Sequence, residues 1–180
     1  MTNQLSKQDW IEHGLAQLAK QGADVIKAEL LAKSLGVSRG SFYWHFKNIS
    51  DYRRALLNHW RRATTLDTIR SIDQTTPANQ RFERLLITAF QDNNPIERAV
   101  RGWALREPMV AKVVNGVDAE RLDYLESTLR SSGVQARHAK VRAQLSYWAY
   151  LGRLMLLEES HRKMSTASTK AIASWIVNAS

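Results

Sequence analysis

Residues 36–51 read GVSRGSFYWHFKNISD, and this stretch decides how the N-terminal part of the chain folds. Its centre, FYWHF at residues 42–46, crowds aromatic side chains and a histidine into five positions. Because positions four apart on a helix share one face, Phe42 and Phe46 are expected to be core residues. Tyr43 cannot share that face and is expected at the surface. Two positions are left open, either at the surface or packed against the next helix: Trp44 and His45.

The residues around this stretch predict a helix-turn-helix. Lys27–Phe46 holds two short helical segments separated by Gly36, which permits the positive φ that a sharp turn requires. Ala32 is small where the two helices must approach closely, and Ser38 can cap the second one. A helix that begins with Arg39 followed by glycine and serine can enter a DNA major groove and contact base edges.

The rest of the chain predicts an all-α protein of about nine helices, because apolar residues recur with helical spacing and Gly and Pro occur singly. Ser6 and Asp9 have the spacing of a capping box at the start of the first helix. Residues 73–80, DQTTPANQ, read as a linker. Gly133 separates two helices, and the second of them is expected over about residues 135–160.

The charge of the chain favours a polyanionic partner. Its 180 residues carry a net charge of +9, with a pI near 10.1, and more than half of this net charge lies in residues 1–62. This balance suits either nucleic acid or an anionic membrane. No apolar run is long enough for a membrane span, and the N-terminus lacks the apolar core of a signal peptide, so we expect a cytoplasmic protein. A membrane-surface protein is disfavoured because the basic residues do not gather on one face of an amphipathic helix, and we expect no membrane partner.

The sequence contains no pattern that indicates an enzyme or a cofactor. Cysteine is absent, which excludes disulfides and thiolate metal sites. No GxSxG, P-loop, HExxH or GxGxxG motif occurs. Glu158 and His161 form one Glu-x-x-His, but a di-iron bundle needs a second copy, and none occurs. We therefore expect no catalytic residues, no metal site and no cofactor.

Residues 30–57, LLAKSLGVSRGSFYWHFKNISDYRRALL, resemble the DNA-binding signature of the TetR family of bacterial transcription regulators. The resemblance implies a helix-turn-helix DNA-binding domain at residues 1–51 and a helical regulatory and dimerisation domain at residues 52–180. It also implies a homodimer that binds a palindromic operator in double-stranded DNA, most often as a repressor, with an affinity modulated by a small-molecule effector.

The family's contacts can be carried over to this chain position by position. Arg39 and Gly40 fall where the family contacts bases, and Arg39 suits bidentate recognition of guanine. In two places the chain departs from the family: Lys27 replaces the usual Ser or Thr cap, and Ile49 replaces a common Lys or Arg. The DNA-binding residues that the resemblance implies are Lys27, Ser38, Arg39, Gly40, Ser41, Tyr43, Trp44, His45 and Lys47.

Two further sets of residues are predicted in the C-terminal part. The family pairs its last two helices across a two-fold axis, which implies a dimer interface of Val141, Leu145, Trp148, Gly152, Met155, Ile172, Trp175 and Ile176. A ligand pocket among the middle helices is expected to involve Phe90, Trp103, Met109, Tyr147 and Tyr150. For both sets, packing inside the core of one chain is the alternative.

The sequence thus predicts a DNA-binding transcription regulator. The alternative is an all-α binding or scaffold protein whose helix-turn-helix no longer contacts DNA. Ile49 and the missing cap at Lys27 are the features that keep this alternative open.

Overall fold

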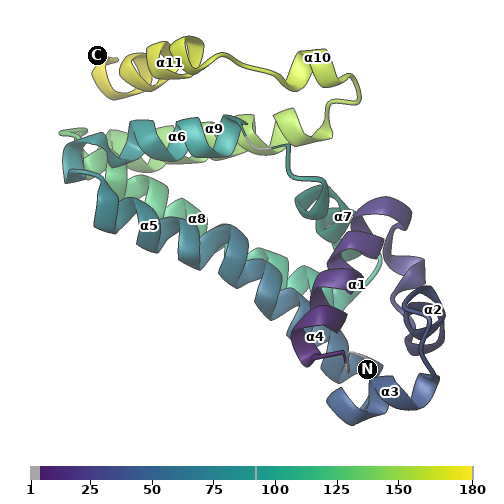
Figure 1. Cartoon of the computed structure of the whole chain (residues 1–180). Coiled ribbons are helices and arrows are strands. Elements are labelled where there is room, and N and C mark those ends of the chain that lie inside the picture. The colour runs from purple at the N-terminus through teal and green to yellow at the C-terminus, as the bar shows by residue number, and fades with distance from the viewer. Residues whose placement is uncertain (1–4, 92, 180) are drawn as a thin grey trace. The chain divides into compact units, whose positions relative to one another are not determined.

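The computed structural model describes residues 5–91 and 93–179, and every regular element in these two ranges is a helix (Figure 1). The all-α prediction is therefore confirmed. Contacts divide the chain into two compact units, the first formed by residues 1–64 and 95–115 and the second by residues 65–94 and 116–180. The domain boundary after residue 51 stays a prediction.

The first unit contains the helix-turn-helix. The predicted capping box starts its first helix, since the Ser6 hydroxyl accepts a hydrogen bond from the Asp9 amide and the Asp9 carboxylate accepts from the Ser6 amide at 2.7 Å. Gly36 has φ 68°, so the sharp turn uses the glycine as expected. In chain order the helices are α1 (Lys7–Gln21), η1 (Ala23–Val25), α2 (Ala28–Ser34), α3 (Arg39–His45), α4 (Ile49–Arg61) and α7 (Pro95–Ala104).

An aromatic core holds α1, α3 and α4 together. Trp10, Phe42 and Tyr52 are fully buried, with ring centroids 5.4 Å apart for Trp10 and Phe42 and 5.3 Å apart for Phe42 and Tyr52. Phe46 packs edge-on against Tyr52 at 4.8 Å. The Tyr52 hydroxyl donates a hydrogen bond of 2.8 Å to the Trp10 carbonyl, and burial raises the pKa of this phenol. Phe42 and Phe46 are thus core residues, as their spacing predicts.

Close approach of α1 to α4 depends on Gly14. A Cβ added at Gly14 would lie 1.7 Å from the hydroxyl oxygen of Tyr52 and 3.0 Å from Leu56. No side chain fits there without displacing the buried tyrosine. Gly14 therefore sets how closely the first helix packs on the helix that follows α3.

The second unit is a helical layer built around a separate core. Phe82, Leu86, Leu129, Tyr147 and Ile176 are among its buried residues. Its helices are η2 (Arg62–Leu66, a π-helical turn shared with the first unit), α5 (Asp67–Thr75), η3 (Ala78–Gln80), α6 (Arg81–Gln91), α8 (Pro108–Ser131, which begins in the first unit), α9 (Ala136–Met155), α10 (Glu159–Arg162) and α11 (Thr166–Asn178).

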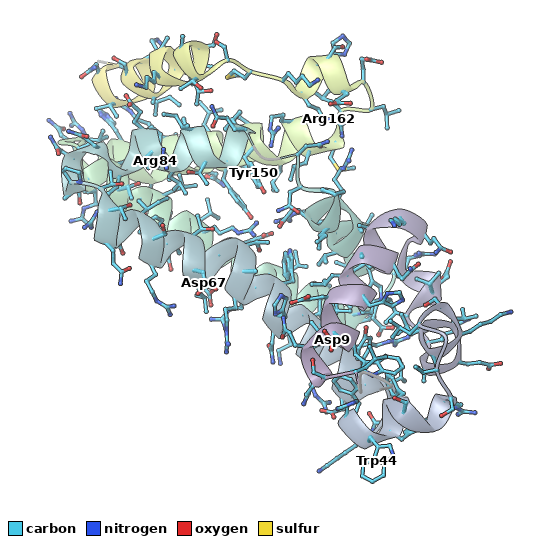
Figure 2. The ribbon with its side chains drawn as sticks, in the orientation of Figure 1. Asp9, Trp44, Asp67, Arg84, Tyr150 and Arg162 are labelled. Atoms are coloured by element: carbon cyan, nitrogen blue, oxygen red, sulfur yellow. The ribbon has the colours of Figure 1, made fainter. Side chains whose placement is uncertain are left out.

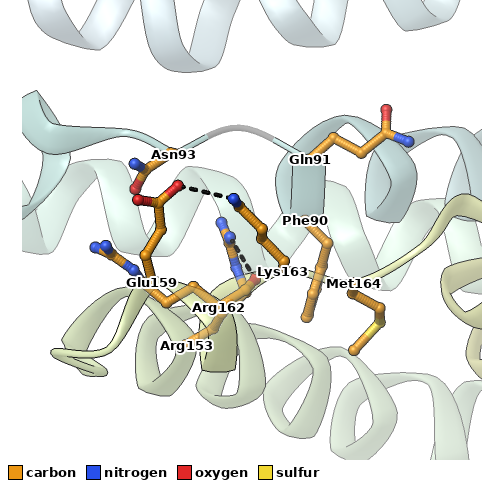
Figure 3. A pocket seen from close by; sticks show the side chains of 8 residues that line it. All are labelled: Phe90, Gln91, Asn93, Arg153, Glu159, Arg162, Lys163 and Met164. Atoms are coloured by element: carbon orange, nitrogen blue, oxygen red, sulfur yellow. Dashed lines mark hydrogen bonds and ion pairs between the residues drawn. The ribbon is translucent and has the colours of Figure 1, made fainter.

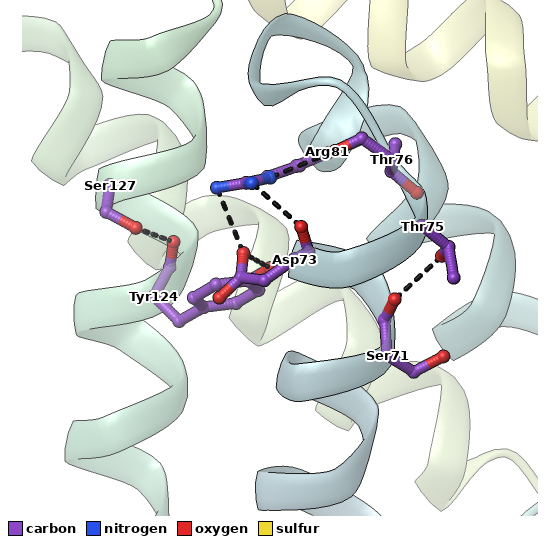
Figure 4. Close-up of polar contacts among 7 residues, drawn as sticks. All are labelled: Ser71, Asp73, Thr75, Thr76, Arg81, Tyr124 and Ser127. Carbon is purple, nitrogen blue, oxygen red and sulfur yellow. Dashed lines mark hydrogen bonds and ion pairs between the residues drawn. The ribbon is translucent and has the colours of Figure 1, made fainter.

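The predicted linker at residues 73–80 is an ordered turn rather than a loose connection (Figure 4). Arg81 forms an ion pair of 3.1 Å with Asp73 and donates to the Thr76 carbonyl. The Tyr124 hydroxyl of α8 donates to the same Asp73 carboxylate at 2.9 Å, and burial together with that carboxylate raises the pKa of Tyr124. These contacts close the α5–α6 turn against α8.

The C-terminal helix is held by an arginine from α9. Arg142 donates hydrogen bonds to the carbonyls of Ile176, Val177 and Ala179, at 2.8, 3.0 and 2.6 Å. A cation at a helix C-terminus satisfies carbonyls that have no partner within the helix. α11 also packs on α6, so the last helix is part of the second unit's core.

The expected helix over about residues 135–160 is shorter than predicted. α9 ends at Met155, Leu156 takes an extended backbone conformation, and the short α10 follows. A buried Arg153 holds this bend, because its guanidinium donates 2.8 Å to the Ala89 carbonyl and 3.3 Å to the Arg162 carbonyl. Across residues 5–91 and 93–179, no helix is both long and apolar enough to cross a bilayer.

Candidate nucleic-acid interface

Helix α3 presents one face to solvent while the opposite face is anchored in the core. Phe42 and Phe46 fix it from behind, and Ser38 occupies the N-cap position. The Ser38 side chain makes no capping hydrogen bond, which differs from the expected cap. Its exposed hydroxyl is therefore not committed to the helix and can accept or donate to another molecule.

Arg39 and Tyr43 form a pair along the exposed face of α3. The Arg39 guanidinium donates a hydrogen bond of 3.0 Å to the Tyr43 hydroxyl and lies 5.5 Å from the centre of its ring. This hydrogen bond raises the pKa of Arg39. Because the two residues are one turn apart, each restricts the rotamers that the other can adopt while the hydrogen bond is formed.

Trp44 is the most exposed aromatic residue of this helix, with 84% of its surface accessible, and it points away from the unit (Figure 2). The alternative left open by the sequence, packing against the following helix, does not occur. His45 is half-buried, with its ring 6.3 Å from that of Phe46. Tyr43 is 47% exposed, in agreement with its predicted place at the surface.

Small residues complete the exposed face. Gly40 lies in the first turn of α3 with an ordinary helical backbone, and a Cβ added there would meet only the Ser38 hydroxyl oxygen, at 3.6 Å. Neither backbone geometry nor internal packing therefore requires a glycine at this position. Ser41 beside it is half-buried.

Exposed basic residues lie before α2 and directly after α3 in the chain. Lys27 is exposed at the N-cap of α2 and makes no capping hydrogen bond, as its residue type implies. Lys47 is exposed after α3, and its backbone N–H donates to the Asp51 carboxylate at 3.2 Å. Ile49 is half-buried at the start of α4, where the Asn48 side chain caps the helix by accepting from the Asp51 amide at 2.9 Å.

One flanking cation, Lys7, has no sequence signal. Its ammonium group lies 5.1 Å from the Phe46 ring centre, because the start of α1 packs beside the end of α3. Only the fold brings residues 7 and 46 together.

This arrangement matches a known family. A family model described as "Bacterial regulatory proteins, tetR family" matches residues 11–56. Residues 11–56 are therefore similar to the tetR family of bacterial regulatory proteins. The resemblance seen in residues 30–57 is thereby confirmed, and the family comprises regulatory proteins. None of the curated proteins matches this sequence.

Solved structures share the fold of the whole chain. The transcriptional regulator FadR from Bacillus subtilis, solved in complex with stearoyl-CoA, is 15% identical with a TM-score of 0.70, covering 96% of this chain and 98% of that one. Salmonella enterica GusR is 15% identical with a TM-score of 0.71, covering 97% and 99%. The fatty acid degradation regulator FadR from Bacillus halodurans is 18% identical with a TM-score of 0.68, covering 96% and 95%.

The five residues predicted to line a ligand pocket are divided between the two units of the chain, and their role as a pocket stays a prediction. Trp103 is buried and Met109 half-buried in the first unit, whereas the other three belong to the second. There Tyr147 is buried and donates 2.6 Å to the Asp118 carboxylate, and its ring stacks on that of Tyr150 at 6.1 Å. These contacts make Tyr147 a core residue.

A pocket does exist in the second unit, between the end of α6 and the α9–α11 connection (Figure 3). It has a volume of about 170 Å³. Phe90 is the one member of the predicted set that lines it. The other walls are mostly polar and come from the end of α6, from α9 and from the segment that follows α9. Its lining includes Phe90, Arg153, Glu159, Arg162, Lys163 and Met164.

The residues predicted to form a dimer interface are mostly exposed in the single chain. On α9 and α11, Trp148, Met155 and Trp175 have 59%, 67% and 65% of their surface accessible. Ile176 differs from the rest, since it is buried in the core of its own chain. It faces inward because the C-terminus of α11 is held onto α9 by Arg142. The exposed members of the set are Val141, Leu145, Trp148, Gly152, Met155, Ile172 and Trp175.

Proposed function

We propose that this chain is a DNA-binding transcription regulator, acting as a repressor, that binds a palindromic operator as a homodimer and responds to a small-molecule effector. Residues 1–51 would bind DNA, and residues 52–180 would dimerise and bind the effector. The observation that carries the proposal is the hydrogen-bonded Arg39–Tyr43 pair on the exposed face of α3, whose opposite face buries Phe42 and Phe46.

The exposed face of α3 suits the reading of base edges. Arg39 offers a planar fork of donors that matches the two acceptors of guanine in the major groove. Gly40 beside it lets the helix backbone approach the bases closely. Tyr43, Trp44 and His45 would contact phosphates and the groove wall, and the flanking lysines would add contacts that do not depend on sequence.

The exposed apolar stripe of α9 supports the homodimer. One face of α9 carries four exposed apolar side chains at helical spacing: Val141, Leu145, Trp148 and Met155. Monomeric proteins rarely expose so continuous an apolar surface to water, so a partner is expected to cover it. A second copy related by a two-fold axis would cover the stripe with itself. Such a dimer would also present two α3 helices to two half-sites of a palindrome.

The effector part of the proposal follows the solved relatives. FadR from Bacillus subtilis was solved in complex with stearoyl-CoA, which supports an effector for this chain without identifying it. An effector changes operator affinity only by its differential affinity for two conformations, with a coupling of about 1–3 kcal/mol. We propose that residues 52–62, most of α4 and the residue that follows it, transmit this coupling.

Gel-shift titration at two salt concentrations tests the DNA-binding proposal, using operator fragments selected from random DNA. Wild-type binding should weaken steeply with salt. Arg39→Ala should weaken the free energy of operator binding by roughly 1–3 kcal/mol and relax the specificity at one position of each half-site. Lys47→Ala should weaken all sequences alike and lower the salt slope by about one phosphate contact.

The same titration separates the regulator from the alternative of a helix-turn-helix that no longer binds DNA. If selection from random DNA enriches no sequence, or if neither substitution changes binding, the regulator proposal is wrong. Ile49→Lys provides a matched test of the family departure, because it restores the common basic residue and should strengthen phosphate binding without changing the selected sequence.

Gly40→Ala should separate stability from function. Glycine inside a helix costs about 0.5–1 kcal/mol relative to alanine, so the substitution should raise the free energy of unfolding by that amount. Operator affinity should fall by roughly tenfold, because the new methyl group would stand between the helix backbone and the bases. Chemical denaturation and gel-shift titration measure the two effects. A variant that gains stability and binds DNA as tightly as wild type would show that Gly40 does not face the bases.

A further inference from the structure

The ring of Tyr43 rests on the core of the first unit, although 47% of the residue is exposed. It meets the fully buried ring of Phe42 edge-on, with centroids 5.3 Å apart and ring planes at 83°. Edge-on contacts of this kind are favourable beyond the apolar area that they bury. The ring of Tyr43 is therefore supported from inside, while its hydroxyl contacts another residue at the surface.

The residue that this hydroxyl contacts is Arg39. The Arg39 Nη2 atom donates to it at 3.0 Å, and the guanidinium carbon lies 5.5 Å from the centre of the Tyr43 ring. The Tyr43 hydroxyl raises the pKa of Arg39, and the charge of Glu29 in α2 does so to a smaller extent. Tyr43 is therefore the main neighbour of a long exposed side chain that otherwise samples many rotamers.

The pair leaves enough hydrogen-bonding groups for DNA. A guanidinium has five N–H donors, and the bond to Tyr43 uses one of them. Bidentate recognition of guanine needs two more, so Arg39 can keep its contact with Tyr43 while it binds a base. The Tyr43 hydroxyl accepts in this bond, so its own O–H can still donate to a phosphate oxygen.

We infer that Tyr43 is a positioning residue for sequence recognition, which holds the guanidinium of Arg39 where it can bind a guanine. This inference rests on the proposed function and gives Tyr43 a role besides a phosphate contact. An arginine that is already held loses less side-chain freedom when it binds guanine, a difference of roughly two- to tenfold in affinity for each half-site. A wrong base does not make the bidentate contact, so its affinity gains nothing. Tyr43 therefore increases the discrimination between bases.

Two DNA fragments of equal length test the inference on the full chain. The first is the operator selected from random DNA, and the second differs from it at the one position of one half-site where Arg39→Ala relaxes specificity. Gel-shift titration at one salt concentration gives both dissociation constants, and their ratio measures the discrimination. This ratio should be roughly 5- to 150-fold for the wild type. A phosphate contact acts on both fragments alike, so it cancels in the ratio.

Tyr43→Phe removes the hydroxyl but keeps the ring against Phe42. Because the lost hydrogen bond is exposed, the melting temperature should stay within about 2 °C of the wild type. The discrimination should fall roughly two- to tenfold. In an Arg39→Ala background, Tyr43→Phe should weaken operator binding at least twofold less than it does in the wild type. Tyr124→Phe, which removes a hydroxyl in the second unit, is the control and should leave the discrimination unchanged.

The inference is overturned if Tyr43→Phe leaves the affinities unchanged or lowers the affinity for both fragments by the same factor, the second being the result expected of a phosphate contact alone. It is equally overturned if the loss of operator affinity is the same in the wild-type and Arg39→Ala backgrounds, or if Arg39→Ala relaxes specificity at no position. In each of these cases a wild-type protein that still selects a DNA sequence retains the proposed function, whereas a protein that selects none contradicts both.

Discussion

Trp148→Asp should convert the proposed homodimer into monomers and lower operator affinity by about a thousandfold. Trp148 is 59% exposed, so the substitution leaves the core of the single chain intact and should change its stability by less than about 0.5 kcal/mol. In a dimer that buries α9, two carboxylates would face each other in an apolar interface, at a cost of several kcal/mol.

The loss of DNA affinity follows from the loss of the second α3 helix. Two linked binding sites gain roughly 10²–10⁴ in affinity over one, because the second contact becomes intramolecular. Analytical ultracentrifugation measures the oligomeric state, and gel-shift titration with a full palindrome and with a single half-site measures the affinity. The variant should bind both DNA fragments equally weakly.

Leu105→Asp is the matched control. Leu105 is 87% exposed and belongs to the first unit. The substitution therefore also replaces an exposed apolar residue with a carboxylate, but at a site outside α9 and α11. It should remain a dimer. A Trp148→Asp variant that still dimerises would place the interface elsewhere, and a monomeric wild-type protein that binds its operator would contradict the homodimer altogether.

The helix-turn-helix could be predicted in detail because its determinants are local. Phe42 and Phe46 are one turn apart in the sequence, and both are buried in the structure. Gly36 lies where the turn needs a positive φ, and it has one in the structure. The sequence could not decide whether Trp44 is buried. Its burial depends on whether Trp44 or a residue of α4 packs into the aromatic core beside Phe42. Tyr52 takes that place, and Trp44 remains in solvent.

The pocket of the second unit could not be predicted because its parts are joined only by the fold. Arginine is usually a surface residue, so nothing in the sequence indicates that Arg153 and Arg162 are buried. No Gly or Pro marks the end of α9, and helical periodicity continues past Met155. The bend is held by long-range hydrogen bonds from Arg153, such as the one to the Ala89 carbonyl.

The sequence could not tell for every apolar residue of α9 and α11 whether it is exposed or buried in its own chain. Periodicity tells which residues share a face, but it does not tell whether that face meets its own chain or another one. Trp175 and Ile176 are neighbours on α11, yet Trp175 is 65% exposed whereas Ile176 is buried. The packing of α11 on its own chain, on α6 and through Arg142 on α9, distinguishes the two.

Gly14→Ala should destabilise the first unit strongly, although the same substitution stabilises most helices. The new Cβ would lie 1.7 Å from the Tyr52 hydroxyl oxygen and 2.9 Å from its Cζ. Tyr52 is fully buried among Trp10, Phe42 and Phe46 and cannot turn aside. We expect a loss of roughly 2–4 kcal/mol, from overpacking and from the broken hydrogen bond to the Trp10 carbonyl.

Gly102→Ala is the control for this prediction. Gly102 lies in α7 of the same unit, and a Cβ added there meets no atom within 4 Å. Its replacement should therefore raise the free energy of unfolding by about 0.5–1 kcal/mol, the ordinary helix preference of alanine over glycine. Urea denaturation followed by tryptophan fluorescence measures both variants on the same scale.

A double-mutant cycle with Tyr52→Phe tests the cause. Removing the hydroxyl deletes the atom that the new methyl group would strike, so Gly14→Ala should cost at least about 1 kcal/mol less in the Tyr52→Phe background than in the wild type. Equal costs in the two backgrounds would show that the clash is not with the hydroxyl. A Gly14→Ala variant that gains stability as Gly102→Ala does would contradict the close approach of α1 and α4, and with it the position of the core that supports α3.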